Sequence, residues 1–472
     1  MREFRVWAPH CDRVDVHVVS PFDKVVALER EDDGYFRGEL DIDPGARYFV
    51  RLDGERERPD PVSCFQPEGV DGPSELVASD PVGGLRRPLG EYVIYEAHVG
   101  TLTPEGAFAS AIRVLDDLVD LGVTALELMP VAQFPGARNW GYDGVYPYAP
   151  QNTYGGPDGL RALVRACHER GLCVVLDVVY NHLGPEGCYL DEFGPYFTDR
   201  HRTPWGRAIN FTEPAVRSFF IDNAVYWCEE FGIDALRLDA VHAIWDKTII
   251  AEMSERTSGY LIAENATNDP RLTDTYGCDA RWNDAFHHAL IAYVAGDRER
   301  YLKDFGSLEQ VAQEIAAPEP DKLVVFSANH DQIGNRALGD RPATRLSPKQ
   351  LKLLAAAVLL SPSVPLVFMG EEYGETNPFQ YFVDHSDPKL IDAVRKGRRK
   401  EFPSVEDPPD PADPATFERS KLDRKDNELR AFYKEMIAMR TKLGFGDRPQ
   451  VEIRGDALIV RRERGTVVLD FS

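Results

Sequence analysis

Four short apolar runs that each end in charged or amide side chains constrain this fold most strongly. They lie at Leu172–His182, Gly232–His242, Gly259–Asn265 and Leu323–Asp331. Strands of a parallel sheet are covered on both faces and are therefore apolar throughout. Polar side chains that gather where such strands end are typical of the active face of a barrel enzyme. The pattern predicts an α/β fold with a parallel barrel and a site at one end of it.

Strand-like and helix-like segments alternate over residues 89–445. Strands are expected at residues 92–98, 123–129, 172–177, 233–239, 261–264, 279–282, 323–328 and 365–369. Helices are expected at residues 108–120, 158–170, 213–231 and 427–443. Eight alternating strands predict a closed (β/α)₈ TIM barrel rather than an open sheet. Insertions at residues 184–210 and 371–426 exceed ordinary loop length, and long loops in a compact domain are usually functional.

Two β-rich segments flank the barrel in the sequence. Residues 1–88 contain short alternating runs separated by Asp-Gly turns, which predicts an N-terminal immunoglobulin-like β-sandwich. Residues 446–472 contain about three strand-like runs and predict a short C-terminal β segment. We expect three domains, with boundaries at residues 88 and 445.

Composition excludes several classes of partner. The chain has 472 residues and a formal net charge of −24, which disfavours nucleic acid and anionic membranes because phosphate binding requires clustered Lys and Arg. Seven cysteines without a CxxC pair predict reduced thiols, no zinc site and a cytoplasmic protein. The first residues lack the apolar segment of a signal peptide, and no apolar run reaches membrane-spanning length.

Two carboxylates end neighbouring strands of the predicted barrel. Asp239 ends the fourth strand and Glu264 the fifth, so their side chains are expected roughly 5 Å apart, the separation that retaining glycosidases use. Arg237 points to the same face as Asp239 and favours an ionised carboxylate there. Apolar neighbours and a nearby carboxylate favour the protonated form of Glu264. We expect Asp239 to be the nucleophile and Glu264 the general acid and then base.

Each of these motifs also has a structural interpretation. An Asp–Arg pair on a strand is more often a salt bridge. Asn181 and His182 could cap the following loop, and Glu264 could lie at the bottom of the barrel. The occurrence of all the motifs in order, each at the end of a strand, favours catalysis. Asp331 is then expected to grip sugar hydroxyls, together with His182 and His330.

The four blocks resemble the conserved regions of the α-amylase family, glycoside hydrolase family 13. They are residues 177–182, 235–239, 263–265 and 329–331. Other segments resemble the maltooligosyltrehalose trehalohydrolases within that family: residues 98–106, 140–144, 282–288, 329–336 and 377–385. The resemblance covers residues 4 to about 443. It implies hydrolysis of the α-1,4 bond next to the terminal trehalose of maltooligosyl trehalose, an α-1,4-glucan oligosaccharide. It also implies functional pairing with a trehalose-forming synthase. The expected chemistry requires no metal or organic cofactor, and no cation-binding loop is apparent in the sequence.

A wider set of side chains is expected to contact the sugar. It consists of Tyr142, Asp177, His182, Arg237, His242, Asp284, Phe286, His287, His330, Gln332, Arg336 and Glu372. Selectivity for the trehalose end is expected to rest on hydrogen bonds from Asp284 or His287, because buried polar groups discriminate more strongly than apolar ones. Phe286 is expected to be a stacking floor, although core packing explains each aromatic residue equally well. Glu372 is expected in the cleft wall.

Two other functions fit parts of this pattern. A 1,4-α-glucan branching enzyme would share Asp239, Glu264 and Asp331, but the segments at residues 329–336 and 379–385 argue against it. A non-enzymatic carbohydrate-binding relative typically lacks one catalytic carboxylate, and all three are present here. Fold alone would not distinguish these functions.

Overall fold

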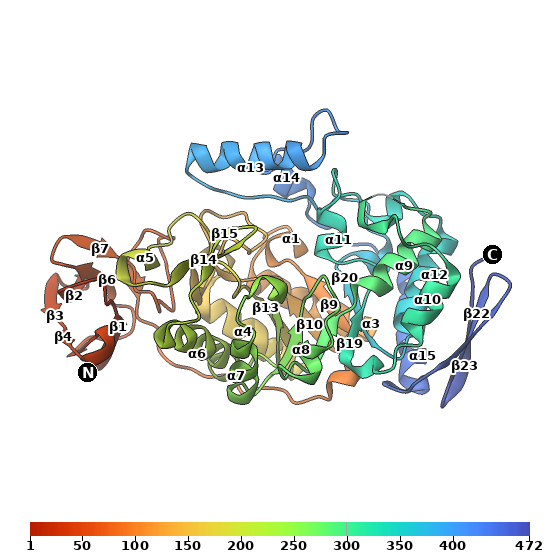
Figure 1. The fold of residues 1–472 in the computed structure, drawn as a ribbon, viewed down its shortest axis with the longest axis horizontal. Coiled ribbons are helices and arrows are strands. Elements are labelled where there is room, and N and C mark those ends of the chain that lie inside the picture. The colour runs from red at the N-terminus through yellow and green to blue at the C-terminus, as the bar shows by residue number, and fades with distance from the viewer. Residues whose placement is uncertain (299) are drawn as a thin grey trace.

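Eight parallel strands form a closed barrel in the computed structural model, which describes residues 1–298 and 300–472 (Figure 1). In order around the barrel they are β9 (Ile94–Ala97), β10 (Ala125–Leu128), β13 (Cys173–Val178), β16 (Ala235–Leu238), β17 (Tyr260–Ala263), β18 (Ala280–Trp282), β19 (Leu323–Val325) and β20 (Val364–Phe368). Strand β20 pairs with β9 and closes the ring. The predicted TIM barrel is confirmed, and each of its eight strands lies where the sequence pattern predicted it.

The barrel interior explains why its strands are apolar. Side chains at alternate strand positions form one buried cluster inside the barrel. Five of them are 0% exposed: Ile94, Val175, Ile262, Val324 and Leu366. Side chains at the intervening positions of each strand point outward and pack against the helices. Both faces of each strand are therefore covered.

The helices surround the barrel, and the predicted long ones are present. They are α1 (Val99–Leu102), α2 (Phe108–Ala111), α3 (Leu115–Leu121), α4 (Gly156–Glu169), α6 (Pro214–Glu230), α7 (Thr248–Arg256), α8 (Arg271–Asp274), α9 (Asp284–Val294), α10 (Leu308–Ile315), α11 (His330–Gly334), α12 (Pro348–Leu359) and α15 (Glu428–Leu443). The helix expected at residues 108–120 is divided into α2, a 3₁₀ turn and α3. Gly122, with φ of 100°, ends α3 in the left-handed conformation that suits glycine.

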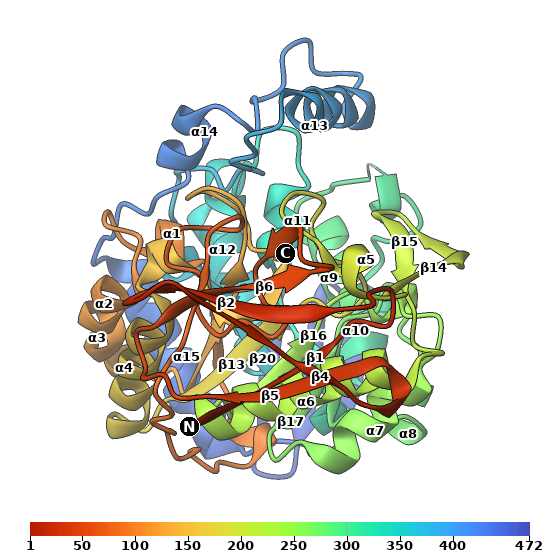
Figure 2. The same cartoon turned by 90° about the vertical axis from the view of Figure 1, so that its left-hand side faces the viewer.

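The two long insertions carry structure of their own. After β13 come α5 (Leu190–Phe193) and a hairpin of β14 (Phe197–Thr203) and β15 (Gly206–Ile209). After β20 come α13 (Pro388–Glu401) and α14 (Pro414–Arg419), which stand above the rest of the molecule (Figure 2). A short antiparallel pair, β11 (Ala132–Gln133) and β12 (Tyr146–Pro150), follows β10.

Antiparallel sheets lie at opposite ends of the molecule (Figure 1). The N-terminal end has a sheet of β1 (Arg2–Trp7), β5 (Tyr35–Leu40) and β4 (Glu29–Arg30), and a second sheet of β3 (Lys24–Ala27), β2 (Val14–Ser20), β6 (Arg47–Leu52), β7 (Arg56–Arg58) and β8 (Ser74–Glu75). The C-terminal end has β21 (Gln450–Arg454), β22 (Ala457–Arg462) and β23 (Gly465–Asp470). The predicted fold class is confirmed, whereas the boundaries at residues 88 and 445 stay predictions.

No helix in the described part of the chain is long and apolar enough to cross a membrane. All seven cysteines are free thiols.

Candidate active site

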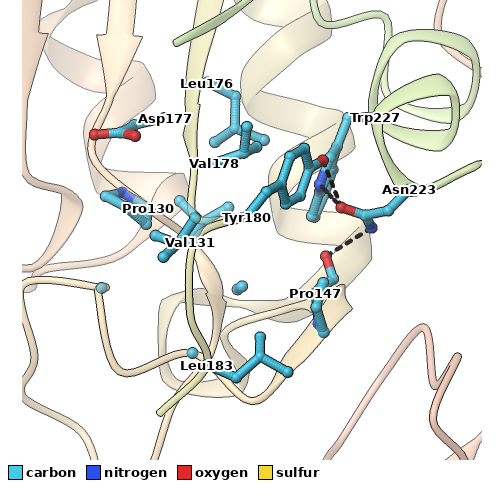
Figure 3. A pocket seen from close by; sticks show the side chains of 14 residues that line it. Pro130, Val131, Pro147, Leu176, Asp177, Val178, Tyr180, Leu183, Asn223 and Trp227 are labelled. Atoms are coloured by element: carbon cyan, nitrogen blue, oxygen red, sulfur yellow. Dashed lines mark hydrogen bonds between the residues drawn. The ribbon is translucent and has the colours of Figure 1, made fainter. Parts of the chain in front are cut away.

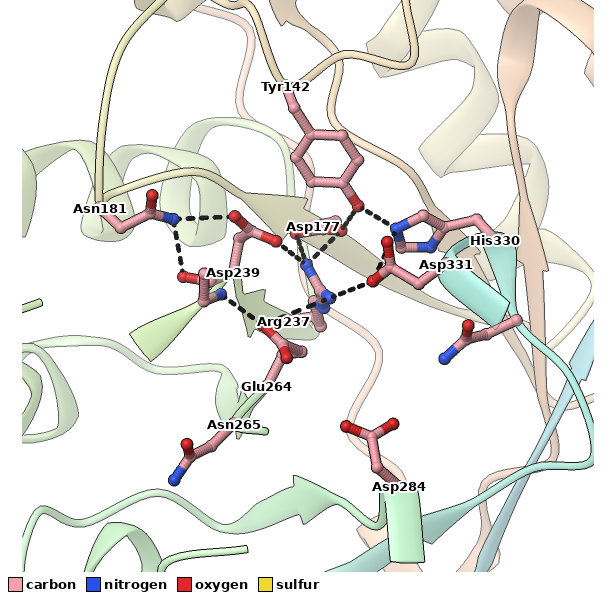
Figure 4. A network of polar contacts seen from close by, with 12 residues as sticks. Tyr142, Asp177, Asn181, Arg237, Asp239, Glu264, Asn265, Asp284, His330 and Asp331 are labelled. Atoms are coloured by element: carbon pink, nitrogen blue, oxygen red, sulfur yellow. Dashed lines mark hydrogen bonds and ion pairs between the residues drawn. The ribbon is translucent and has the colours of Figure 1, made fainter. Parts of the chain in front are cut away.

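One buried guanidinium gathers four carboxylates at the C-terminal ends of the barrel strands (Figure 4). Arg237 is fully buried on β16, and its Nη1 lies 2.8 Å from Asp177 Oδ2 and 2.6 Å from Asp239 Oδ1. Its Nη2 lies 3.9 Å from Glu264 Oε2 and 4.0 Å from Asp331 Oδ2. The structure therefore brings together the residues that the four sequence blocks singled out.

Strand register explains why neighbouring strands deliver these side chains. Leu238 of β16 is paired with Ala263 of β17, and each is the last residue of its strand. The next residues, Asp239 and Glu264, continue the ladder, since the Glu264 amide donates to the Leu238 carbonyl at 3.0 Å. Both carboxyl groups therefore emerge at the same level on the rim of the barrel.

Asp239 is held by a donor on each carboxylate oxygen. Arg237 binds Oδ1, and Asn181 Nδ2 donates to Oδ2 at 2.8 Å and to the Asp239 carbonyl at 3.0 Å. Both donors come from buried side chains, so the carboxylate has one fixed orientation. Both neighbours of the Asp239 carboxylate are hydrogen-bond donors, and an ionised carboxylate only accepts, so the partners match.

Glu264 lies in a setting that favours its neutral form. Burial raises the pKa of Glu264 to about 8, and the carboxylates of Asp239, Asp331 and Asp284 add to this effect while Arg237 opposes it. A carboxyl group with this pKa holds a proton at neutral pH. Asp239 and Glu264 therefore offer a bound carboxylate and a proton donor side by side.

A strained residue links the two carboxyl groups. Ala240, directly after Asp239, has φ of 40° and ψ of 48°, a left-handed conformation that costs free energy for a residue with a Cβ. In that conformation its amide donates to Glu264 Oε2 at 2.6 Å. The backbone strain thus sets the orientation of Glu264.

A second polar chain lies beneath the rim and includes a charged imidazole. Glu96 of β9 accepts hydrogen bonds from the backbone amide and Nδ1 of His330. Burial acts against charge on this ring, yet the carboxylates of Asp331 and Glu96 outweigh it and raise the pKa of His330 to about 9. His330 Nε2 lies 2.7 Å from the hydroxyl of Tyr142, which donates to Asp177 Oδ2 at 2.7 Å. The charged ring of His330 therefore contacts Tyr142 directly and is connected through the Tyr142 hydroxyl to Asp177.

These groups border a cavity of about 790 Å³, which we call the carboxylate cavity. Its volume is within the range of natural ligand sites. Eight of the residues expected at the site line it: Tyr142, His182, Asp239, His242, Glu264, Asp284, Asp331 and Gln332. Asp177, Arg237 and His330 lie behind them and are hydrogen-bonded to Tyr142 or Asp239.

Phe286 and His287 do not reach the carboxylate cavity, which corrects the expectation of direct sugar contact. Phe286 is 1% exposed and packs in the core. Asn283 caps α9 and accepts the Phe286 amide at 3.3 Å, so the helix begins at Asp284. Phe286 is then turned about 200° from Asp284, away from the cavity. His287 Nδ1 lies 2.7 Å from the Ser327 carbonyl, and burial lowers its pKa to about 3.

Arg336 and Glu372 also lie elsewhere. The guanidinium of Arg336 pairs with Asp297 at 3.2 Å and Asp340 at 3.0 Å. Glu372 is 1% exposed and accepts the Tyr95 hydroxyl at 3.0 Å. Neither residue is part of the cavity wall, so the expected contact from Glu372 to the cleft is wrong.

Sequence reasoning missed several side chains that shape the site. Glu96 is a lone charge in the predicted first strand, a signal that could have identified it. Trp205 is 50% exposed at the tip of the β14–β15 hairpin and stacks on His182 with ring centroids 4.6 Å apart. Tyr381 and Gly397 of the second insertion also line the cavity. Trp205, Tyr381 and Gly397 reach the cavity only because both insertions fold over the barrel.

A much smaller cavity lies behind Asp177 (Figure 3). Its volume of about 20 Å³ is that of a single water. Asn223 crosses its far side and accepts hydrogen bonds from Tyr180 at 2.7 Å and Trp227 at 3.1 Å. This space is part of the packing and too small for a sugar.

Over residues 1–298 and 300–472, no group of three or more His, Cys, Asp or Glu side chains is arranged to hold a metal ion. Asn181 directs its amide nitrogen, a donor, toward Asp239.

Comparisons with known proteins identify the family of the catalytic domain and a solved structure of the same fold. Residues 96–205 match the model of the alpha amylase catalytic domain. A putative alpha amylase from Salmonella typhimurium superimposes with a TM-score of 0.92 and 36% identity over 100% of this chain and 91% of that chain.

Two relatives of known name are similar over most of their length, and a third only over part of it. The malto-oligosyltrehalose trehalohydrolase of Saccharolobus solfataricus is 43% identical over 93% of this chain and 85% of that protein. That of Arthrobacter ramosus is 41% identical over 96% of this chain and 89% of that protein. A 1,4-alpha-glucan branching enzyme of Mycobacterium bovis is 30% identical over only 62% of this chain and 46% of that enzyme. The chain therefore belongs to the malto-oligosyltrehalose trehalohydrolases, glycoside hydrolases of the alpha-amylase family.

Proposed function

We propose that this protein is a retaining α-glycosidase that cleaves the α-1,4 bond next to the terminal trehalose of maltooligosyl trehalose and releases trehalose. One observation supports the chemistry: Asp239, whose carboxylate is held by two donors, and Glu264, whose pKa is raised to about 8, follow the ends of neighbouring strands. The family membership carries the choice of substrate.

The reaction follows from these two carboxyl groups. Asp239 attacks the anomeric carbon while Glu264 gives its proton to the glycosidic oxygen, and trehalose leaves as the carbon–oxygen bond breaks. Glu264, now ionised, takes a proton from water. That water attacks the anomeric carbon and releases Asp239, so the configuration is retained.

The neighbouring groups position the sugar. Asp331 is partly exposed on the cavity wall and is assigned to a pair of hydroxyls on the ring that reacts. His182 and Tyr142 line the same wall. Arg237 holds Asp239 in the orientation for attack. These roles rest on geometry and on the chemistry of each side chain.

Selectivity for the trehalose end is assigned to Asp284 rather than to His287. Asp284 lines the carboxylate cavity and accepts a hydrogen bond from Gln332 Nε2 at 3.2 Å. Gln332 in turn accepts the Tyr301 hydroxyl at 2.7 Å. A fixed polar group that is matched to a sugar hydroxyl discriminates strongly against a substrate that lacks it.

Comparison of kcat/KM on maltooligosyl trehalose and on maltopentaose tests this assignment. Asp284→Asn is expected to lower the ratio of the two values, whereas His287→Gln serves as a buried control that leaves the ratio unchanged. An unchanged ratio in Asp284→Asn would place selectivity in other residues.

The cellular setting is proposed from the substrate and from the thiols. Maltooligosyl trehalose must come from an enzyme that builds a trehalose end on a glucan chain, so the protein is expected to work with such a synthase. The seven free thiols support a reducing, cytoplasmic location.

Product analysis separates this function from its alternatives. Incubation with maltooligosyl trehalose is expected to yield free trehalose and the shortened maltooligosaccharide. A branching enzyme would instead change the colour of iodine-stained amylose without forming trehalose, and a binding protein would form no product. Absence of trehalose from a folded sample would refute the proposal.

A further inference from the structure

Glu96 contacts the active site from inside the barrel, where it lies on β9. Its side chain is 1% exposed and is not part of the wall of the carboxylate cavity. Its Oε2 accepts the backbone amide of His330 at 3.0 Å, and its Oε1 accepts a hydrogen bond from Nδ1 of the same residue. Two contacts fix both the backbone and the ring of His330. Glu96 therefore sets the position of His330 without contact to a sugar.

Three aromatic rings enclose the imidazole of His330. The ring of Tyr142 is stacked on it at 5.4 Å between centroids, and those of Trp140 and Trp282 lie at 5.7 and 6.0 Å. A buried ring packed in this way cannot turn to exchange its two nitrogens unless its neighbours move. Nδ1 therefore stays toward Glu96.

The hydroxyl of Tyr142 has one proton and a neighbour on each side. Its oxygen lies 2.7 Å from His330 Nε2 and 2.7 Å from Asp177 Oδ2. If the imidazole is neutral, with its proton on Nδ1, its Nε2 has a lone pair and competes with Asp177 for the hydroxyl proton. If the imidazole is charged, Nε2–H donates to the hydroxyl oxygen, and the hydroxyl proton is directed to Asp177. The charge on His330 thus decides the direction of this hydrogen-bond chain.

The direction of the chain affects the group that holds the nucleophile. Nη1 of Arg237 is shared by Asp177 and Asp239, at 2.8 and 2.6 Å. Burial raises the pKa of Asp177 to about 7, and the charge on His330 and the Tyr142 hydroxyl bond oppose the rise. With the chain reversed, Asp177 would take up a proton, and Arg237 would lose one of the charged partners that fix it beside Asp239.

We propose that Glu96 is a positioning residue, which keeps the imidazole of His330 charged and thereby directs the hydrogen-bond chain toward the guanidinium that holds the nucleophile. This inference deepens the proposed function and rests on it for the measured rates. A carboxylate at one imidazole nitrogen determines what the other nitrogen can do. Asp331, 3.4 Å from Nε2, also favours the charged ring, but it lines the cavity and is assigned to the substrate. Glu96 is a partner that substrate binding leaves in place.

Steady-state kinetics of Glu96→Gln tests this role. The amide keeps the shape of the side chain but not its charge, so kcat on maltooligosyl trehalose is expected to fall about 10- to 100-fold, the effect of one charged hydrogen bond. KM is expected to stay within about threefold, because the lost contact orients reacting groups and does not bind the sugar.

Glu127→Gln is the matched control for this substitution. Glu127 is paired with Glu96 in the register of β10 and β9, is also buried, and has no hydrogen-bond partner for its carboxyl oxygens among the described residues. Its kcat is expected to stay within about twofold of the wild type. Equal kcat values in Glu96→Gln and Glu127→Gln would overturn the proposal.

The pH dependence separates positioning from packing. The titratable and charged groups that face His330 are Glu96, His98, Glu127, Tyr142, Asp177, Arg237 and Asp331. In the wild type, burial acts against charge on the ring, but the carboxylates of Asp331 and Glu96 raise the pKa of His330 to about 9, so the ring is charged below that pH. Without the Glu96 carboxylate this pKa should fall, and the ring of the variant should regain its proton only as pH is lowered. The ratio of variant kcat to wild-type kcat is therefore expected to rise at least about threefold from pH 8 to pH 5.5. A constant ratio would show that Glu96 contributes packing only and would overturn the proposal.

NMR of protein labelled with ¹⁵N in its imidazole rings measures the charge directly. The chain has 11 histidines, and the signals of His330 are identified by their loss in His330→Asn. At pH 7 we expect a proton on both ring nitrogens of His330 in the wild type and on one in Glu96→Gln. A neutral His330 in the wild type would overturn the proposal, even if Glu96→Gln does not fold. Because this measurement needs no substrate, a protein with a charged His330 that releases no trehalose would refute the proposed function and not the role of Glu96 in charging the ring.

Discussion

Asp234 and Asp239 flank the same strand and are both 8% exposed, yet they have different surroundings. Asp234, before β16, accepts two backbone amides and faces His168. Asp239, after β16, is held by side chains of Arg237 and Asn181 and borders the carboxylate cavity. The first ties segments of the chain together, and the second leaves one side open to a substrate. The comparison shows how one short strand serves stability with its start and chemistry with its end.

The C-terminal and N-terminal ends of the barrel strands also differ in the ratio of buried carboxylates to the donors that neutralise them. At the C-terminal end one guanidinium meets four carboxylates, and burial is the main reason that the pKa of Asp177 is raised to about 7 and that of Glu264 to about 8. At the N-terminal end Asp234 has a donor for each of its oxygens. Four carboxylates around one guanidinium destabilise the folded protein. The same excess of carboxylates helps to keep Glu264 protonated, so that it can donate a proton at neutral pH.

The largest effect on catalysis is expected from a substitution of Asp239. Asp239→Ala is expected to lower kcat on the order of 10⁴-fold or more, because no other group can form the covalent intermediate. Its free energy of unfolding should change less than that of a variant at Asp234. Steady-state kinetics and urea unfolding measure the two quantities. A variant that keeps a tenth of wild-type activity would refute the assignment of the nucleophile.

Removal of the proton donor is the next largest effect. Glu264→Gln is expected to lower kcat on natural substrate about 10²- to 10⁴-fold. Because the pKa of Glu264 is raised to about 8, the acid form is present below that pH, and wild-type activity should fall as pH rises through it. The variant should lose this alkaline limb, and a glycosyl fluoride, which needs no protonation, should partly restore its rate. An unchanged alkaline limb in the variant would point to another acid.

The sequence predicted the barrel and its carboxylates because both depend on local pattern. Apolar runs such as Cys173–Val178 must be buried, and residues just beyond a strand must emerge at its end. Arg237 and Asp239, two residues apart, share a face in any strand. These relations do not depend on distant parts of the chain, so they could be inferred from the sequence alone.

Other features depend on contacts between distant segments. The direction of Phe286 depends on where α9 begins, and a shift of one residue turns a helical side chain by about 100°. The contact of Glu96 with His330 joins residues 234 positions apart. Trp205 reaches His182 only because a hairpin folds back over the rim. Helical periodicity and strand alternation carry no information about such contacts.

A smaller effect is expected at the other end of β16. Asp234→Asn replaces a carboxylate oxygen by a donor that faces the amide of Leu85 or Val174, and it should lower the free energy of unfolding by about 2–4 kcal/mol. The kcat of the folded protein should stay within about twofold of the wild type, since distant sites act independently. Urea unfolding provides the measurement. Asp41→Asn, at a carboxylate that is 93% exposed, is the control with little expected change. Equal free energies of unfolding of Asp234→Asn and Asp41→Asn would refute the assignment of a stabilising role to Asp234.

The smallest effect on activity and stability is expected from a substitution of Glu127 on β10, which lies inside the barrel between the two ends of its strands. Glu127 is fully buried, and neither of its carboxyl oxygens has a hydrogen-bond partner among the described residues. Burial, aided by the carboxylates of Glu96 and Asp177, raises the pKa of Glu127 well above its ordinary 4.5, so the folded protein holds the neutral acid. Glu127→Gln keeps shape and charge state, and kcat should stay within about twofold, as expected for an isosteric neutral replacement away from the reacting atoms.

The pH dependence of stability distinguishes a neutral Glu127 from an ionised one. As pH rises above 4.5 the unfolded chain loses the proton of Glu127 while the folded chain keeps it, so this group lowers the free energy of unfolding of the wild type progressively. Glu127→Gln has no such group, and its stability relative to the wild type should increase from pH 5 to pH 8. The amide must still be desolvated, which offsets much of the gain and leaves a net change near neutral pH of about 1 kcal/mol. A constant difference across this range, measured by urea unfolding, would show that Glu127 is ionised and that the excess of carboxylate extends into the middle of the barrel.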